Sequence, residues 1–177
     1  MHATPARPSR IALVGAHETG KSTLAERLAT TMPGWHVVDE PYRTLEAEGH
    51  VFSDPPTTSD FEAQLRRSMA DVESAEPAVI FDRSPVDLFA YLLVLDRLPP
   101  DAIAAWFREV HEATVSFDLV VFVPIEQPDR VPGASATRLR RRVDRLLRAG
   151  LVEGEWGLVA PVLEVDGSPE DRVEQIR

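Results

Sequence analysis

Residues 11–23 restrict the possible folds of this chain more than any other segment. The apolar run at residues 11–14 leads directly into residues 15–23, which read GAHETGKST. The two glycines, the lysine and the hydroxyl residues stand at the spacing G-x-x-x-x-G-K-[ST]. Leu24 and Leu28 then share one face of the helix that the pattern predicts. A strand, a glycine-rich loop and a helix in this order gather backbone N–H groups and a helix N-terminus around one anion. The segment therefore predicts a phosphate-binding loop.

The lysine of this loop is the single lysine of the chain. Among the 19 lysine and arginine residues, only Lys21 is a lysine. A compact ammonium group on a flexible stem can reach between the β- and γ-phosphates of a nucleotide, whereas a planar guanidinium is too bulky. The loop thus predicts ATP and Mg²⁺ as cofactors, with a catalytic role for Lys21 and a hydroxyl for the metal from Ser22. The alternative is a glycine-rich turn with an exposed lysine. The predicted nucleotide-binding residues are Gly15, His17, Glu18, Thr19, Gly20, Lys21, Ser22 and Thr23.

Five apolar runs alternate with helical patterns along the chain, which is typical of a parallel sheet with crossover helices. The runs cover residues 11–14, 36–38, 78–81, 119–123 and 162–165. The pattern predicts an α/β fold, a three-layer sandwich with a five-stranded parallel sheet. Ligands of such sheets bind beyond the carboxyl ends of the strands. Acidic residues at those ends, such as Glu40 and Asp82, are therefore candidates for chemistry.

Two kinds of local signal predict the helices between these runs. Ser84 and Ser168 are each followed by a proline and, three residues on, by an acid, as in a capping box at a helix start. Apolar side chains at helical spacing predict buried helix faces, and the first of these stripes has the alternative of forming part of a substrate pocket. The two stripes comprise Phe61, Leu65, Met69 and Val72, and Ile103, Phe107 and Val110.

Composition limits the class of protein. A length of 177 residues suits one domain, expected at residues 10–177 after a flexible lead-in at residues 1–9. The chain has no cysteine, and no apolar run approaches the ~20 residues of a membrane span, so we expect a cytoplasmic protein with no membrane contact. A net charge of −10 argues against a nucleic-acid polymer as partner. The oligomeric state, including a homodimer, stays open.

The triplet Asp82-Arg83-Ser84 directly follows the third apolar run. An aspartate at the end of a strand beside a phosphate-binding loop can organise Mg²⁺ or accept the proton of an attacking hydroxyl. We therefore predict a catalytic and metal-binding role for Asp82, with helix capping as the alternative. Arg83 is predicted to hold a phosphate or substrate, or else to pair with an acid.

The second apolar run ends in Asp39-Glu40-Pro41-Tyr42-Arg43. Carboxylates can hold hydroxyl groups, an aromatic ring can stack on a flat ligand, and an arginine can bind an anion. We predict that Glu40 and Arg43 recognise a small polar acceptor. The alternative is a proline turn whose charges are solvated.

Arginines cluster at residues 138–148, where six occur beside one acid, Asp144. Leu139, Val143 and Leu146 predict the buried face of a helix, and Arg138, Arg142 and Arg145 then line one flank of that face. Such a flank can neutralise charge on a triphosphate, as arginine fingers do. We predict a lid around residues 127–148 and catalytic roles for Arg138 and Arg142, with a solvated face as the alternative.

Together these motifs resemble the small P-loop kinases of nucleosides, nucleotides and related metabolites. The chain is similar to compact ATP-binding domains of AAA type and, beyond them, to nicotinamide riboside kinases, deoxynucleoside kinases and thymidylate kinases. The resemblance covers residues 11–176 and implies a P-loop NTPase sandwich whose five-stranded sheet has the order 2-3-1-4-5. It implies that Asp82 is the base or metal aspartate. It also implies that Glu40 and Arg43 touch the acceptor, that arginines 138–145 belong to a mobile lid, and that residues 165–169 border the adenine. Residues 127–138 match no single member of this group.

The function that this reading predicts is ATP-dependent phosphoryl transfer to a hydroxyl or phosphate of a small nucleoside-like metabolite. Two alternatives share the same loop: an NTPase or nucleotide-sensing regulator without an acceptor, and a phosphotransferase that modifies an antibiotic or natural product. A GTPase switch is disfavoured, because a chain whose only lysine is Lys21 has no Asn-Lys-x-Asp guanine motif.

Overall fold

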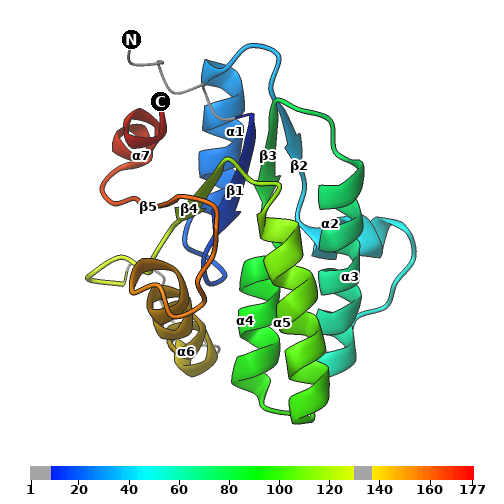
Figure 1. Ribbon diagram of the computed structural model, residues 1–177. Helices are drawn as coiled ribbons and strands as arrows, with labels where there is room; N and C mark the ends of the chain where they lie inside the picture. Colours follow the sequence, from blue (N-terminus) through cyan, green and yellow to red (C-terminus); the bar gives the residue numbers. More distant parts are fainter. Residues whose placement is uncertain (1–8, 130–136) are drawn as a thin grey trace.

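The computed structural model describes residues 9–129 and 137–177 (Figure 1). Its five strands form one parallel sheet in the order β2-β3-β1-β4-β5, which confirms the predicted topology. The predicted lid lies partly outside the described residues, and the predicted division into a lead-in and one domain stays a prediction. The strands are β1 (Arg10–Val14), β2 (His36–Val38), β3 (Val79–Asp82), β4 (Leu119–Phe122) and β5 (Val162–Glu164).

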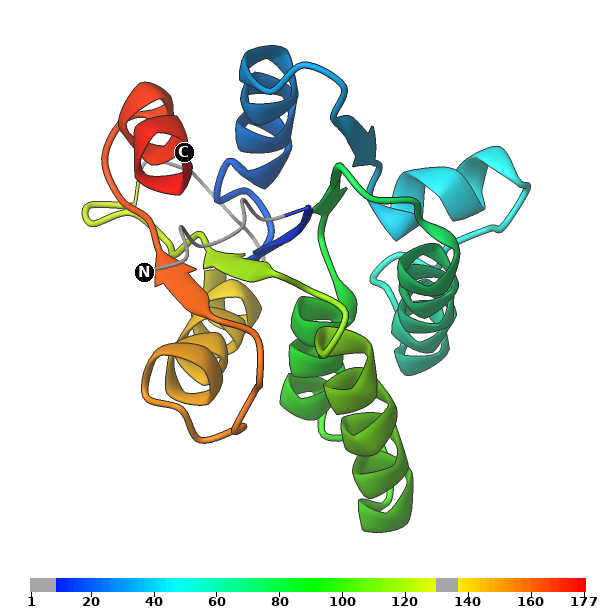
Figure 2. The same ribbon diagram turned by 45° about the horizontal axis from the view of Figure 1, so that its top comes forward.

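Helices cover both faces of this sheet. In Figures 1 and 2, α1 and α7 lie on one face, and α3, α4, α5 and α6 lie on the other. The fold is therefore the three-layer sandwich that the alternating pattern predicts. None of the described helices is long and apolar enough to cross a membrane. The helices are α1 (Lys21–Thr31), α2 (Pro41–Ala47), α3 (Thr58–Ser74), α4 (Pro85–Leu95), α5 (Pro100–Thr114), α6 (Thr137–Leu147) and α7 (Pro169–Ile176), with a π-helical turn, η1 (Arg148–Val152), after α6.

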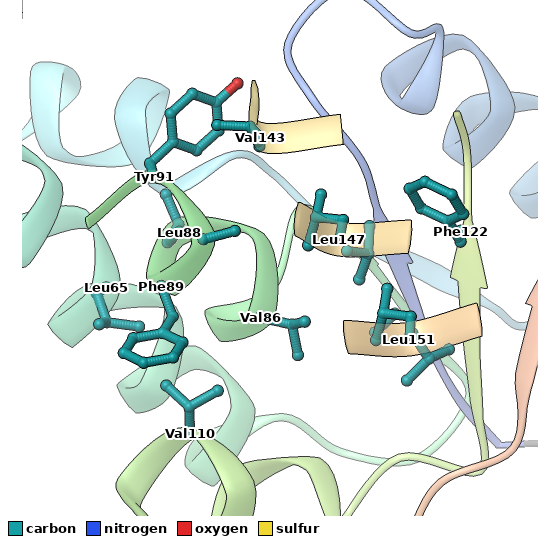
Figure 3. Packing of buried hydrophobic residues seen from close by; sticks show 14 of the residues in the cluster. Leu65, Val86, Leu88, Phe89, Tyr91, Val110, Phe122, Val143, Leu147 and Leu151 are labelled. Carbon is teal, nitrogen blue, oxygen red and sulfur yellow. The ribbon is translucent and has the colours of Figure 1, made fainter. Parts of the chain in front are cut away.

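Alternation along β1 divides the core between these two layers. Ile11 and Leu13 point toward α1 and α7, whereas Ala12 and Val14 point toward the opposite helices. This follows from the period of two in a strand, because both faces of a parallel sheet are covered. In the larger cluster α6 packs against α4, and Val143 of α6 and Tyr91 of α4 both belong to it (Figure 3). The helix that carries the arginines is thereby fixed against the sheet.

The predicted helix starts are confirmed. Ser84 and Ser168 each accept a hydrogen bond in a complete capping box, with Asp87 and Asp171 as the returning acids. The predicted stripe of α5 is partly wrong, because Trp106 is buried whereas Phe107 is 37% exposed. The indole N–H of Trp106 donates to Glu62, which turns this face of α5 toward α3.

Candidate functional site

The phosphate-binding loop lies at the carboxyl end of β1, in the middle of the sheet. Gly15 passes so close to β4 that a Cβ atom there would lie 2.4 Å from the carbonyl oxygen of Val123. Gly20 caps α1 with a φ of 89°, a left-handed conformation that glycine adopts without strain. Both glycines of the motif thus meet a steric requirement. Together they aim the N-terminus of α1 at the centre of the loop.

Lys21 is buried at the first position of α1, and its Nζ donates to the carbonyl oxygen of Ala16 at 2.7 Å. Burial, with a smaller contribution from Arg83, lowers the pKa of Lys21 to about 8, although nearby carboxylates including Asp82 oppose this shift. The ammonium group is held inside the curve of the loop, where the motif predicts contact with phosphates.

Two buried arginines that the sequence reasoning did not single out hold the outer side of the loop. Arg140 of α6 donates to the carbonyl oxygens of His17 and Glu18 at 2.7 and 2.9 Å. Arg172 of α7 donates to the carbonyl oxygen of Thr19 at 3.0 Å. A cavity of about 190 Å³ opens beside these contacts, and both arginines line it.

Asp82 ends β3 and lies opposite Leu13 of β1, which puts it next to the loop strand as predicted. Its side chain is buried, and its Oδ1 has no hydrogen-bond partner among the described residues. Burial raises the pKa of the Asp82 carboxyl, while the hydroxyl of Ser22 stabilises the charged form and opposes the shift. The structure therefore brings the two predicted metal-binding residues together.

Arg83 connects this aspartate with the predicted acceptor residues. Its backbone has a φ of 83°, which is unusual for a residue with a side chain. The guanidinium lies 3.6 Å from Glu40, 3.5 Å from Asp87 and over the ring of Tyr91. Burial disfavours its charge, but Asp87, Tyr91 and Glu40 keep the pKa of Arg83 above its usual value. Burial likewise raises the pKa of Asp87 to about 6 against the effect of Arg83.

His17 joins the loop to the same cluster. Its backbone N–H donates to the hydroxyl of Tyr91 at 2.8 Å, and its Nδ1 lies 2.7 Å from that oxygen. Burial and the charge of Arg83 lower the pKa of His17 to about 4, so the ring is neutral at pH 7. A neutral ring can accept the proton of the tyrosine hydroxyl at Nδ1. This contact ties the loop to α4.

Tyr42 and Phe52 form an aromatic pair beside the predicted acceptor residues. Tyr42 of α2 stacks on Phe52 with ring centroids 4.4 Å apart, and His50 lies 4.4 Å from Phe52 on a tilted plane. Glu40, which precedes α2, is half-buried, whereas Arg43 is exposed. The structure thus brings Glu40 to Arg83 but leaves Arg43 on the surface of α2.

Asp60 of α3 fixes the loop that carries His50 and Phe52. It accepts from the backbone N–H groups of Ser53 and Thr57 and lies 3.3 Å from Nε2 of His50. Burial favours its neutral form, but hydrogen bonds from the backbone and side chain of Thr57 and from His50 lower the pKa of Asp60 to about 2.

The predicted arginine flank of α6 faces away from the buried side of this helix. Arg138, Arg142 and Arg145 are exposed, and Arg142 and Arg145 line an open groove beside Leu93 and Val94 of α4. The predicted stripe faces the core, since Val143 is buried and Leu139 and Leu146 are half-buried against the core cluster. The buried face also includes Leu147 and Arg140, which the pattern did not assign to it. The phosphate contacts predicted for Arg138 and Arg142 stay predictions.

A family model described as an AAA domain matches residues 10–172. A comparison with curated proteins finds no match. Among solved structures, the chain is similar to deoxyadenosine kinase from M. mycoides with bound dATP, at a TM-score of 0.67 and 15% identity, covering 95% of this chain and 96% of that one. It is similar to NadR in complex with NAD and AMP-PNP, at a TM-score of 0.65 and 18% identity, covering 95% of this chain and 48% of that one. Thymidylate kinase from Candida albicans has a TM-score of 0.62 at 14% identity, with 98% and 91% covered. These likenesses show the P-loop kinase fold.

Proposed function

The chain belongs to the AAA domain family whose model spans residues 10–172, and from this premise we propose that it is an ATP-dependent small-molecule kinase. It transfers the γ-phosphoryl group of ATP to a hydroxyl or phosphate of a nucleoside-like metabolite. One observation carries the proposal: the buried ammonium of Lys21 and the buried carboxylate of Asp82 lie at the carboxyl ends of two neighbouring strands, β1 and β3.

The loop supports the binding of phosphates through donors that the protein itself does not use. The backbone N–H groups of Glu18 and Gly20 make no hydrogen bond to another backbone group among the described residues, whereas the turn at residues 17–18 directs the N–H of Thr19 back toward Ala16. The helix N-terminus at Lys21 adds a partial positive charge at the same point. With a pKa of about 8, Lys21 carries its proton at pH 7. These groups together suit a triphosphate.

Mg²⁺ fits the oxygen atoms at this point of the site. The hydroxyl of Ser22 and the unpartnered Oδ1 of Asp82 are hard oxygen donors of the kind that Mg²⁺ prefers. Within residues 9–129 and 137–177, no group of three or more acidic, histidine or cysteine side chains is arranged to hold a metal. When bound, Mg²⁺ neutralises charge on the β- and γ-phosphates.

The chemical step depends on position and charge, because the transition state of phosphoryl transfer is loose. The raised pKa of Asp82 makes its carboxylate a better acceptor for the proton of the incoming hydroxyl. Lys21 and the buried guanidinium of Arg83 supply positive charge near Asp82. Arg83 also holds Glu40 at 3.6 Å, in a position to orient the acceptor.

The cavity beside the loop suits the base of the nucleotide. It has a volume of about 190 Å³ and is lined by Arg140 and Arg172, by Leu24 and by Pro169. The ring of Pro169 and the side chain of Leu24 present apolar surfaces against which a base can pack. Of residues 165–169, which the resemblance places at the adenine, only Pro169 lines this cavity. The other four line a neighbouring cavity of about 480 Å³.

The aromatic pair supports an acceptor that contains a ring. Tyr42 is 37% exposed and stacks on Phe52 within the segment that follows Glu40, so its free face is available to a flat ligand. A nucleoside-like acceptor offers both a ring for Tyr42 and hydroxyl groups for Glu40.

An acceptor screen tests the proposal. ADP formation from MgATP is measured with nucleosides, nucleotides and cofactor precursors, each with and without the protein. We expect slow hydrolysis alone and at least tenfold stimulation by one acceptor class, and we expect Lys21→Ala to remove the stimulated rate. Tight ATP binding with no stimulation by any acceptor would favour a nucleotide-sensing regulator instead.

A further inference from the structure

Three consecutive carbonyl groups of the phosphate-binding loop are capped by buried arginines. Nε of Arg140 donates to His17 at 2.7 Å, its Nη2 donates to Glu18 at 2.9 Å, and Nη1 of Arg172 donates to Thr19 at 3.0 Å. The two arginines belong to different helices, α6 and α7. They therefore reach the loop from separate parts of the fold and converge on one short stretch of backbone.

The planarity of the peptide bond gives these contacts a consequence for the opposite side of the loop. In a trans peptide the carbonyl of one residue and the N–H of the next point in opposite directions. The capped carbonyls therefore belong to the same peptide units as the N–H groups of Glu18, Thr19 and Gly20. Of these N–H groups, those of Glu18 and Gly20 make no hydrogen bond to another backbone group among the described residues. When a carbonyl is held toward the arginines on the outer side of the loop, the N–H of the same peptide unit points toward the inside of the loop. The charged arginine that binds the carbonyl also polarises this N–H.

Both arginines are themselves held in place by carboxylates in the segment that follows β4. Arg140 forms an ion pair with Asp129, and Nη2 of Arg172 lies 2.7 Å from Glu126. Nε of Arg172 also donates to the carbonyl oxygen of Gly167 at 3.1 Å. The side chains are almost fully buried, with 1% of Arg140 and 4% of Arg172 exposed. Their positions are thus fixed, and solvent screens their charges weakly.

We propose that Arg172 and Arg140 are positioning residues that act through the loop: they orient its N–H groups for phosphate binding. This role rests on the proposed function, since it requires that the loop bind phosphates. Arg172 carries the sharper test because it holds a single loop carbonyl and comes from the last helix. Losing that bond frees the peptide unit of Thr19 and Gly20, and so weakens the binding of any polyphosphate, with or without a base.

The test compares two probes, MgATP and inorganic tripolyphosphate with Mg²⁺, by titration calorimetry. For Arg172→Met we expect both dissociation constants to rise by the same factor, about 10- to 100-fold, which is the range for a hydrogen bond from a charged donor. Arg172→Lys keeps the charge but loses the fork of donors, and we expect it to weaken both probes by about three- to tenfold. Thermal unfolding shows whether each variant is folded. If Arg172→Met does not fold, the dissociation constants of Arg172→Lys for the two probes are compared with those of the unaltered protein instead.

Arg27→Met is the matched control. Arg27 joins α1 to Glu170 of α7 by an exposed ion pair and does not touch the loop. We expect it to leave the affinity for both probes unchanged. A loss in Arg172→Met that affects MgATP but not tripolyphosphate would make Arg172 a contact of the base and overturn the positioning role. Unchanged affinity for both probes would also overturn it, while leaving the proposed function intact. Failure of the unaltered protein to bind either probe would overturn the proposed function, and the positioning role with it.

Discussion

Raising the pH should weaken ATP binding through the single lysine. Burial and Arg83 lower the pKa of Lys21 to about 8 in the free protein. Phosphates bound beside it favour the charged form, so in the complex the pKa lies well above that value. The affinity for ATP is therefore at its maximum below pH 8, where Lys21 of the free protein is protonated. The affinity falls as the pH rises through 8, because a deprotonated Lys21 must take up a proton when ATP binds. Between pH 7 and pH 9 the dissociation constant should rise about tenfold, or about 1.4 kcal/mol, as the linkage relation gives for a pKa of 8.

Calorimetry of MgATP binding at pH 7, 8 and 9, in buffers with different heats of ionisation, measures both the affinity and the protons taken up. We expect uptake of about 0.1 proton at pH 7 and about 0.9 at pH 9. Lys21→Met should bind more weakly at all three values and lose this pH dependence. An affinity of the unaltered protein that stays constant from pH 7 to 9, or an equal slope in Lys21→Met, would refute the reasoning.

Three further substitutions separate the parts of the site. Asp82→Asn should lower kcat by about 100-fold or more, while the ATP affinity measured by calorimetry stays nearly constant. A raised Mg²⁺ requirement in the kinetic assay would identify a role in metal binding, and near-normal turnover would remove Asp82 from the mechanism. Glu40→Gln should raise the acceptor KM or lower kcat in steady-state kinetics, and a loss of ATP affinity instead would place Glu40 in the nucleotide site. Gly15→Ala should abolish ATP binding or lower the melting temperature, because its Cβ would meet the Val123 carbonyl oxygen at 2.4 Å, and normal values of both would contradict that contact.

The sheet and the loop were predictable because their signals are local. Each strand is a short apolar run that ends at a polar residue or a turn, and the spacing of Gly15, Gly20 and Lys21 specifies the loop without distant contacts. The observed strands differ from the predicted runs by about one residue at their ends, as in β3, which includes Asp82. Capping boxes at Ser84 and Ser168 were likewise readable from four consecutive residues.

The two buried arginines were not predictable from periodicity. Hydrophobic spacing assigns arginine to solvent, and for that reason it did not assign Arg140 to the buried face of α6. The contacts that bury Arg140 and Arg172 join residues 123 and 153 positions apart in the sequence. No local pattern encodes such a contact. One available hint was the position of Arg172 directly after the capping box of α7, close to the predicted adenine border.

Following the phosphorus atom is the most direct test of the central claim. Phosphorus NMR of MgATP, the protein and an acceptor distinguishes phosphoryl transfer from hydrolysis, because the two routes give different products from the γ-phosphate. If the protein is a kinase, a new phosphorylated-acceptor signal grows as ATP is converted to ADP, and this signal is absent with Lys21→Ala. Release of inorganic phosphate alone with every acceptor class would contradict it and leave the protein an NTPase.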